Sequence, residues 1–379
     1  MRVTLKPVAA AFVIFGAFAG AWSVAAVDIE RTFHLSDAQL GFVLAAGILA
    51  STVMAAISGA LVDRFGAGVA LTRSLIAWGS LIVVEAFAPH IGIFATAFII
   101  GMAAGGAVDV VMNVIAADAL APEPGKLVRF HGLFNGAAVL GASITAIVLD
   151  VGRSWRVVWF ATAVIAIGIG IVTRRSPVPE PPKHTVPSTW RAVADLRHEG
   201  LVRLAAVFGV AAMVEGGVAT WGILYLRKHL GVGVLAGVSA YVVGETLATI
   251  ARVAGGPMLQ RVGSRRAIAI GGGLAAAGLT AEALSSNIAV AAIGLGAAAV
   301  GISVVWPLLI ADVNNEAPHP AVAIGGVTAC GYLGMVAGPP IVGVLSGVFT
   351  PSVGLLFLAA GAIFVVLVPT QIRVSKVET

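Results

Sequence analysis

Three acidic residues interrupt long apolar stretches of this sequence, and each could bind a proton or a polar solute. They are Asp109, Glu215 and Glu245. An ionisable side chain at bilayer depth costs at least about 2.5–3.5 kcal/mol on insertion scales, so each needs a reason to be there. Because apolar surroundings disfavour the charged form of a carboxyl group, such a group can exchange a proton near neutral pH. We therefore expect these acids to handle protons or solute, or to form polar contacts inside the protein.

Two of these acids have polar neighbours at helical spacing. Asn113 follows Asp109 by one helical turn, so the two side chains share one face of a helix. Tyr241 precedes Glu245 by one turn, and Arg252 follows it by two. This spacing indicates either a proton or solute site at Glu245 or an internal clamp between Glu245 and Arg252, and both interpretations stay open.

Other polar and aromatic residues are weaker candidates. His131 and Asn135 stand one helical turn apart and could contact a proton or solute, or pack near a helix end. Trp306 could line a cavity, although packing is the simpler interpretation. Glu85 and Glu282 lie near the ends of apolar stretches, where we expect their carboxyl groups to reach water.

The motifs of several enzyme classes are missing from the sequence. There is no Walker loop for ATP hydrolysis, no G-x-S-x-G or H-E-x-x-H, and no Cys/His cluster with metal-ligand spacing. The single cysteine excludes a disulfide within the chain. We therefore expect no enzymatic activity, no metal and no cofactor, with a proton gradient as the energy source.

The composition requires a membrane. The 379 residues are 59% hydrophobic and 11% charged, whereas soluble domains carry about 25% charged residues. A spanning helix needs about 20 apolar residues, and twelve such spans are expected. They fall near 8–27, 40–62, 69–88, 91–117, 130–149, 157–173, 203–226, 235–258, 267–286, 288–313, 321–347 and 351–370.

Charge and proline divide and orient these spans. The stretch 174–200 is rich in proline and charge and reads as a cytoplasmic linker between halves 1–173 and 201–379. With both termini in the cytoplasm, 18 of the 23 lysines and arginines fall on the cytoplasmic side. The basic residues thus follow topology and form no nucleic-acid patch. The expected location is the inner, cytoplasmic membrane, crossed many times.

One short charged turn occurs twice and suggests an internal duplication. Its first copy runs from Gly59 through Asp63, Arg64 and Gly66 to Gly68, between the second and third spans. The second copy runs from 255 to 266 and keeps Arg261 and Gly263. An Asp–Arg pair beside glycines suits close helix approach and a charge latch at helix ends. We expect gating roles for Gly59, Asp63, Arg64, Gly66, Arg252 and Arg261. At Gly338-Pro339-Pro340 we expect either a gating bend or a simple kink.

The first turn resembles the loop between helices 2 and 3 of the major facilitator superfamily, G-x-L-[AV]-D-R-x-G. In the second copy Gln260 stands in place of the acid. Further stretches resemble the MosC/YbjJ-like branch of that superfamily. They are Asp109–Val114, Arg129–Phe134, Glu215–Arg227 and Gly331–Pro340. The branch often has Asp where Thr220 stands here, so one acidic cavity position is absent.

The resemblance implies an all-α polytopic membrane protein of twelve transmembrane helices in two pseudo-symmetric six-helix bundles. In such proteins helices one, four, seven and ten line a midplane cavity, which would place Asp109 and Glu215 in opposite halves. The branch includes a membrane protein from a rhizopine gene region, a hint of polyol or amino-sugar solutes. The helix-five signature of drug antiporters is absent, since 136–141 has no proline.

The expected function is secondary active transport of a small polar solute by alternating access, as a monomer in the bilayer. Proton coupling is expected, and sodium coupling stays open. The midplane acids outnumber the midplane base, so a neutral or cationic solute such as a polyol, amino sugar or sugar is favoured. The alternatives are a transporter-like solute sensor or accessory protein, and an efflux antiporter for drugs or metabolites.

Overall fold

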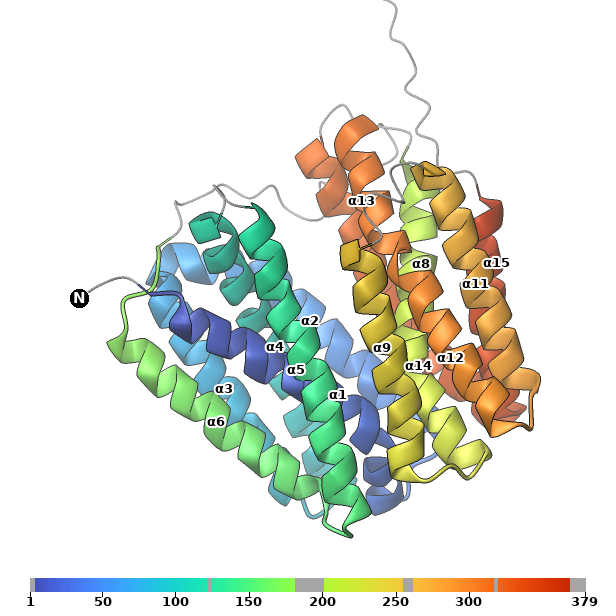
Figure 1. The fold of residues 1–379 in the computed structure, drawn as a ribbon. Coiled ribbons are helices and arrows are strands. Elements are labelled where there is room, and N and C mark those ends of the chain that lie inside the picture. Colours follow the sequence, from blue (N-terminus) through green and yellow to red (C-terminus); the bar gives the residue numbers. More distant parts are fainter. Residues whose placement is uncertain (1–3, 121–123, 181–200, 255–261, 317–319, 369–379) are drawn as a thin grey trace, which may run out of the picture. The chain divides into compact units, whose positions relative to one another are not determined.

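The described part of the chain is mostly helical. The structure is a computed structural model that describes residues 4–120, 124–180, 201–254, 262–316 and 320–368. Within these ranges all regular secondary structure is helical (Figure 1). This agrees with the expected all-α class, because a chain in lipid must satisfy its backbone polar groups within each segment.

The helices follow the apolar spans closely. The first six are α1 Lys6–Phe33, α2 Asp37–Phe65, α3 Ala67–Phe87, α4 Ile91–Leu120, α5 Pro124–Asp150 and α6 Trp155–Arg175. The others are α8 Val202–Leu224, η1 Tyr225–His229, α9 Val234–Ala254, α11 Ser264–Leu284, α12 Ile288–Ser303, α13 Val305–Glu316, α14 Pro320–Val348 and α15 Pro351–Leu367. Among the described residues eleven helical stretches are long and apolar enough to cross a membrane, and α15 is a shorter apolar helix of 17 residues.

Two spans depart from a simple helix. The tenth is divided at Val304 into α12 and α13, and the seventh ends in the π-helical turn η1. In contrast, α14 continues through Pro339 and Pro340, which lie inside it. A proline in a helix interior removes a backbone hydrogen bond, so the two residues leave carbonyl groups of the preceding turn without their usual donor.

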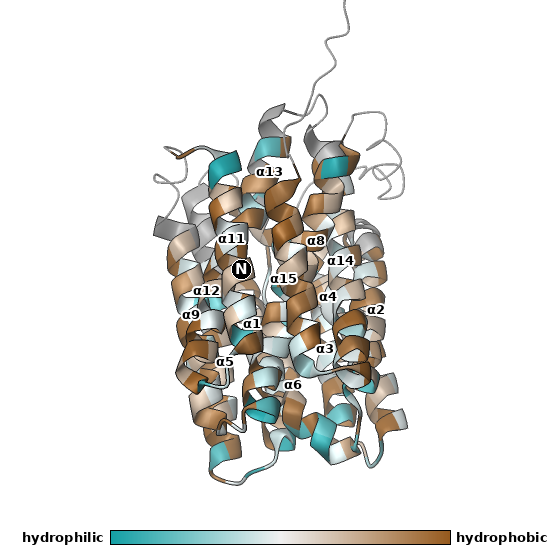
Figure 2. Cartoon of the chain, turned by 90° about the vertical axis from the view of Figure 1, so that its right-hand side faces the viewer, coloured by the Kyte–Doolittle hydropathy of each residue, from teal (hydrophilic) through white to brown (hydrophobic). Residues whose placement is uncertain are grey.

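The surface of these helices is strongly apolar. Large hydrophobic side chains such as Phe42, Val53 and Ile293 are 58%, 59% and 71% exposed. Strongly hydrophilic segments lie mostly near the ends of helices (Figure 2). Such a surface is incompatible with water over large areas and suits a lipid environment, so the helices span a membrane.

The chain divides into two compact units. The first contains 1–34 and 46–186, and the second contains 35–45 and 187–379. The first turns of α2 therefore belong to the second unit, which the sequence did not predict. In the first unit α1 packs against α5, and α3 packs against α4 and α6. In the second unit α8 packs against α14, and α11 packs against α12 and α15.

Glycines allow the closest of these contacts. A Cβ atom on Gly141 of α5 would collide with the backbone oxygen of Ala17 in α1. In the second unit a Cβ atom on Gly334 of α14 would collide with the backbone oxygen of Gly209 in α8. Small residues let helix backbones approach in lipid, so the same packing solution is used in both units.

Helices α3 and α11 repeat a second shared feature. Each follows a glycine with positive φ, 81° at Gly66 and 85° at Gly263. Each also carries a glutamate near its end, Glu85 and Glu282, at the same spacing from that glycine. Residues with a side chain rarely adopt such φ values, which explains why the second copy of the turn keeps Gly263 although it has lost the acid.

Candidate solute and proton sites

Asp109 and Asn113 form a hydrogen-bonded pair inside α4. The Nδ2 group of Asn113 donates to Asp109 Oδ1 at 3.0 Å and to the Asp109 backbone oxygen at 2.9 Å. Both side chains are half-buried. No lysine or arginine occurs in α4. The predicted shared face is confirmed, and the amide of Asn113 provides Asp109 with a neutral donor on its own helix.

Tight packing surrounds the turn that precedes Asp109. A Cβ atom on Gly106 would collide with the backbone oxygen of Ser51 in α2. Gly105 faces the rings of Phe15 and Trp78, whose centroids are 5.3 Å apart. The two glycines thus allow α4 to lie close to α2 and to an aromatic cluster one turn before Asp109.

Glu215 lies in the second unit, on α8. Its side chain is half-buried, and two glycines follow it directly. A Cβ atom on Gly217 would lie 2.5 Å from a methyl group of Leu358 in α15, and one on Gly216 would lie 3.9 Å from Met335 in α14. The segment of α8 that follows Glu215 therefore packs against α14 and α15 through glycines and not through bulky side chains.

Glu245 is half-buried on α9, and Tyr241 one turn earlier is buried. Thr249 donates its hydroxyl proton to the Glu245 backbone oxygen at 2.8 Å. The side chain of Arg252 lies outside the described residues, so the clamp between Glu245 and Arg252 stays a prediction.

The weaker candidates fall into two groups. Asn135 is half-buried on α5, but the side chain of His131 lies outside the described residues. Trp306 of α13 contacts Phe208 of α8 in a tilted arrangement with ring centroids 4.1 Å apart, and it also faces Gly331 of α14. Trp306 is thus engaged in helix packing, the simpler of its two interpretations.

The predicted gate is described only in part. Arg64 is exposed, with its guanidinium carbon 5.2 Å from the ring centroid of Phe65. Gly66 has the positive φ given above. The side-chain surroundings of Gly59 and Asp63 lie outside the described residues, and so does all of Arg261. A gating role for these residues stays a prediction.

The expectation that Glu85 and Glu282 reach water is wrong. Their exposed fractions are 2% and 0%. Trp159 Nε1 of α6 donates to Glu85 Oε2 at 2.9 Å. Neither oxygen of Glu282 has a hydrogen-bond partner within the described part of the chain. Both acids are covered because neighbouring helices approach closely at glycines, Gly101 beside Glu85 and Gly294 beside Glu282.

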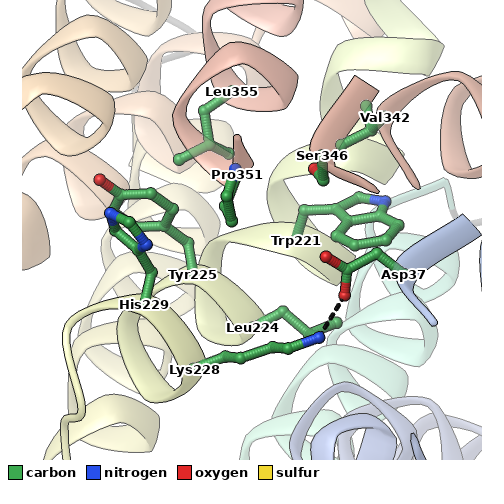
Figure 3. Close-up of a pocket in the computed structure, with 10 residues that line it drawn as sticks. All are labelled: Asp37, Trp221, Leu224, Tyr225, Lys228, His229, Val342, Ser346, Pro351 and Leu355. Carbon is green, nitrogen blue, oxygen red and sulfur yellow. Dashed lines mark hydrogen bonds and ion pairs between the residues drawn. The ribbon is translucent and has the colours of Figure 1, made fainter. Parts of the chain in front are cut away.

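An ion pair that no sequence pattern indicated lies in the second unit. Lys228 Nζ of η1 is 2.5 Å from Asp37 Oδ1 at the start of α2 (Figure 3). Their side chains are 39% and 12% exposed. Lys228 lies in a basic run at the end of the seventh span, which served above only to orient the chain in the membrane. The separation of 191 residues gave no local signal for this pairing.

The ion pair borders a small, mostly apolar cavity. Its volume is about 20 Å³, room for about one water molecule. Its polar lining includes Asp37, Lys228, Trp221 and Ser346 (Figure 3). Trp221 is 4% exposed, and its Nε1 group has no hydrogen-bond partner among the described residues. The indole N–H is thus a buried donor beside a space that admits an acceptor.

Two glycines hold the first turns of α2 against α14 beside this cavity. A Cβ atom on Gly343 would lie 2.5 Å from the Asp37 backbone oxygen, and one on Gly41 would lie 2.6 Å from the Pro339 backbone oxygen. The backbones of α2 and α14 are therefore in direct contact at both glycines. The ion pair and this contact together form what we call the Asp37 junction, comprising Asp37, Gly41, Lys228, Pro339 and Gly343.

Membrane-spanning helices in two units with a repeated helical architecture define a polytopic membrane protein. The sequence profile of the Major Facilitator Superfamily matches residues 8–339, and the chain belongs to this superfamily. Its members transport small-molecule solutes across membranes, so the chain is a solute transporter and not an enzyme.

Relatives and solved structures agree with this assignment. The chain is 24% identical to membrane protein MosC of Rhizobium meliloti over 367 residues, which cover 96% of this chain and 89% of that protein. The structure of a nucleoside transporter, NupG, matches with a TM-score of 0.78 at 13% identity, covering 96% and 98% of the two chains. A D-xylose–proton symporter matches with a TM-score of 0.73 at 16% identity, covering 96% and 97%. At these identities the two structures show the fold alone.

Proposed function

We propose that this chain is a proton-coupled secondary transporter of a small, neutral or cationic polar solute in the cytoplasmic membrane. The observation that carries the proposal is the Asp109–Asn113 pair, a carboxyl group within an apolar helix that contains no lysine or arginine. Its local partner is a neutral amide, which can hydrogen-bond to the carboxyl group with or without a proton. Asp109 can therefore change charge without breaking an ion pair on its own helix.

The charge of the solute follows from the balance of charged groups within the spans. Asp109, Glu215 and Glu245 are acidic, and Arg252 is the basic residue that we place at comparable depth. A transporter for anions needs a cation at the solute site, because an unpaired anion in a low-dielectric site is strongly disfavoured. Neutral solutes rich in hydroxyl groups, such as polyols or sugars, and cationic solutes such as amino sugars fit this balance.

Proton binding at Asp109 and Glu215 would drive the cycle. The same fold is used by a D-xylose–proton symporter, and we extend proton coupling to this chain as a proposal. With both termini in the cytoplasm, the Asp37 junction lies on the outer side of the membrane and acts as a latch there. The turn from Gly59 to Gly68 lies on the inner side and contains the inner latch, Asp63 and Arg64.

The first test is a measurement of internal pH in proteoliposomes that contain the full chain. Polyols, sugars, amino sugars, amines and carboxylates are added outside, one at a time, with and without a sodium gradient. We expect a solute-specific proton flux, reduced at least about tenfold in Asp109→Asn and in Glu215→Gln. The control is Asp150→Asn, which changes an exposed carboxylate at the end of α5.

Three results would count against this function. A proton flux that survives unchanged in both variants would remove Asp109 and Glu215 from the coupling mechanism. Solute uptake that follows the sodium gradient and moves no protons would show that sodium, and not the proton, is the coupling ion. A response to carboxylates alone would contradict the proposed class of solute.

A further inference from the structure

The start of α3 receives its cap from a distant part of the chain. Glu180 Oε2 accepts a hydrogen bond from the Ala67 backbone N–H at 2.7 Å, and Oε1 accepts one from the Gly68 N–H at 3.3 Å. The first N–H groups of a helix have no partner within the helix. The capping position of α3, Gly66, has no side chain, and the first turn contains no acidic residue. Glu180 thus supplies the carboxylate that α3 lacks.

The residues before Glu180 are also held in place. Val178 is 6% exposed, and one of its methyl groups would lie 3.2 Å from a Cβ atom on Gly68. The Thr4 backbone N–H donates to the Pro177 backbone oxygen at 3.0 Å. We call residues 177–180 the linker strap, because this segment follows α6 and lies across the start of α3.

The strap explains two glycines of the charged turn. A Cβ atom on Gly66 would lie 3.3 Å from Glu180 Oε1, which is tighter than most Cβ contacts, and φ at Gly66 is 81°. Gly68 leaves room for Val178 in the same way. The turn that carries Asp63 and Arg64 is therefore shaped to accept the strap, in addition to any contacts of the two charged residues.

The corresponding helix of the second unit is held differently. At the start of α11 the Ser264 hydroxyl donates to Asp312 Oδ2 at 2.8 Å, an acid from the adjacent α13. Here the carboxylate comes from a transmembrane helix of the same unit, whereas Glu180 belongs to the segment that leads into the linker. A displacement of the linker therefore acts directly on α3.

We propose that Glu180 is a positioning residue of the transport cycle, whose carboxylate fastens the linker strap to the charged turn between α2 and α3. Movement of the linker would break two backbone hydrogen bonds of α3 at once and free the turn. The proposal rests on the transporter family of the chain and does not require proton coupling. The strap holds the turn on the inner side of the membrane, whereas Ser346 lies near the outer side, so in an alternating-access cycle loss of the strap should favour inward-open states in which Ser346 is less accessible.

The contact itself can be tested without a solute, by hydrogen exchange of the full chain in lipid nanodiscs. In Glu180→Ala the amides of Ala67 and Gly68 should exchange about two- to fivefold faster, the range expected for loss of a helix cap. Glu180→Gln keeps one acceptor oxygen and should give an intermediate rate. Asp150→Asn should leave the rates unchanged. Equal rates in Glu180→Ala and the parent protein would overturn the proposal.

The positioning role needs a second readout that a purely structural contact would not change. We would measure maleimide labelling of Ser346→Cys in a Cys330→Ala background, which removes the one native cysteine. Glu180→Ala should slow labelling at least about threefold, with Glu180→Gln between the two and Asp150→Asn unchanged. Unchanged labelling, together with faster exchange at α3, would reduce Glu180 to a structural cap and overturn its role in the cycle.

These readouts separate this inference from the proposed function. If the chain moves no protons, the exchange and labelling experiments still decide the role of Glu180. If protons move as proposed, Glu180→Ala should also lower the turnover number while the KM for solute stays unchanged. A higher KM with the turnover number retained would place Glu180 in solute binding and contradict the positioning role.

Discussion

Helices α3 and α11 share a backbone design but differ in the partners of their polar groups. Both follow a glycine with positive φ, and both carry a buried glutamate two residues before their last residue. In the first unit Trp159 donates to Glu85. Trp159 is the fifth residue of α6, whereas the fifth residue of α15 is Leu355, and Glu282 has no hydrogen-bond partner within the described residues. The duplication has thus preserved what the backbone requires, while the side-chain contacts have diverged.

This difference separates two kinds of constraint. A glycine with positive φ, or one in contact with a neighbouring backbone, is fixed by geometry that any working copy must keep. A hydrogen bond between side chains can be lost when the buried group is allowed to stay unpaired, at a cost of about 1–3 kcal/mol. Glu282 of the second unit is such an unpaired buried group. Structural stability does not explain why this unit keeps it.

The largest loss of stability is expected at the glycine contacts between helices that both units share. Gly141→Ala and Gly334→Ala each insert a methyl group against a backbone oxygen of the adjacent helix. We expect each to destabilise its unit by about 1–3 kcal/mol, the usual cost of overpacking, measured as a lower Tm in detergent.

Matched controls exist for both substitutions. Gly136 on α5 and Gly347 on α14 have nothing within 4 Å of the position that an added methyl group would take. Alanine is a better helix former than glycine by about 1 kcal/mol, so Gly136→Ala and Gly347→Ala should keep or raise the Tm. A large loss in only one of Gly141→Ala and Gly334→Ala would show that the shared packing is not equally important in the two units.

A loss of stability in the first unit only is expected at the buried acids. Trp159→Phe leaves Glu85 without its donor and should destabilise the protein by about 1–3 kcal/mol. Glu282→Leu removes an unpaired buried group and should leave the Tm unchanged or higher. Thermal melting of both variants decides the matter. A Tm loss in Glu282→Leu as large as that in Trp159→Phe would mean that Glu282 makes a stabilising contact and that the two units are alike after all.

The smallest effect on stability is expected at the Asp37 junction. Lys228 is 39% exposed, and exposed ion pairs contribute about 0–1 kcal/mol. Lys228→Ala should therefore shift the Tm little, yet it should accelerate labelling of Ser346→Cys because the cavity loses one wall. Arg31→Ala, a change at another exposed cation, is the control. Labelling that is equally slow in both variants would show that the ion pair does not close this cavity.

The sequence was sufficient for features that depend on local patterns. The apolar runs predicted the spans to within a few residues, because a helix in lipid needs both length and apolarity. The spacing of Asp109 and Asn113 predicted their shared face, since a helix places residues four apart on one side.

The sequence was insufficient where distant segments meet. Burial of Glu85 and Glu282 depends on glycines and side chains of other helices, and no local pattern shows it. The ion pair between Asp37 and Lys228 joins groups that each looked like an ordinary charge at a helix end. The same holds for Glu180, which lay in a stretch that the proline content marked only as a linker.

The position of the linker strap also affects how the protein is made. The cap of α3 lies 113 residues beyond the amide that it binds. At about 5–20 residues per second of synthesis, α3 waits roughly 6–23 s for Glu180 to leave the ribosome. During that interval the first amides of α3 depend on water or lipid headgroups. The first unit is therefore complete only after its last span has been made, and a ribosome that stalls before Glu180 leaves α3 in the membrane without its cap.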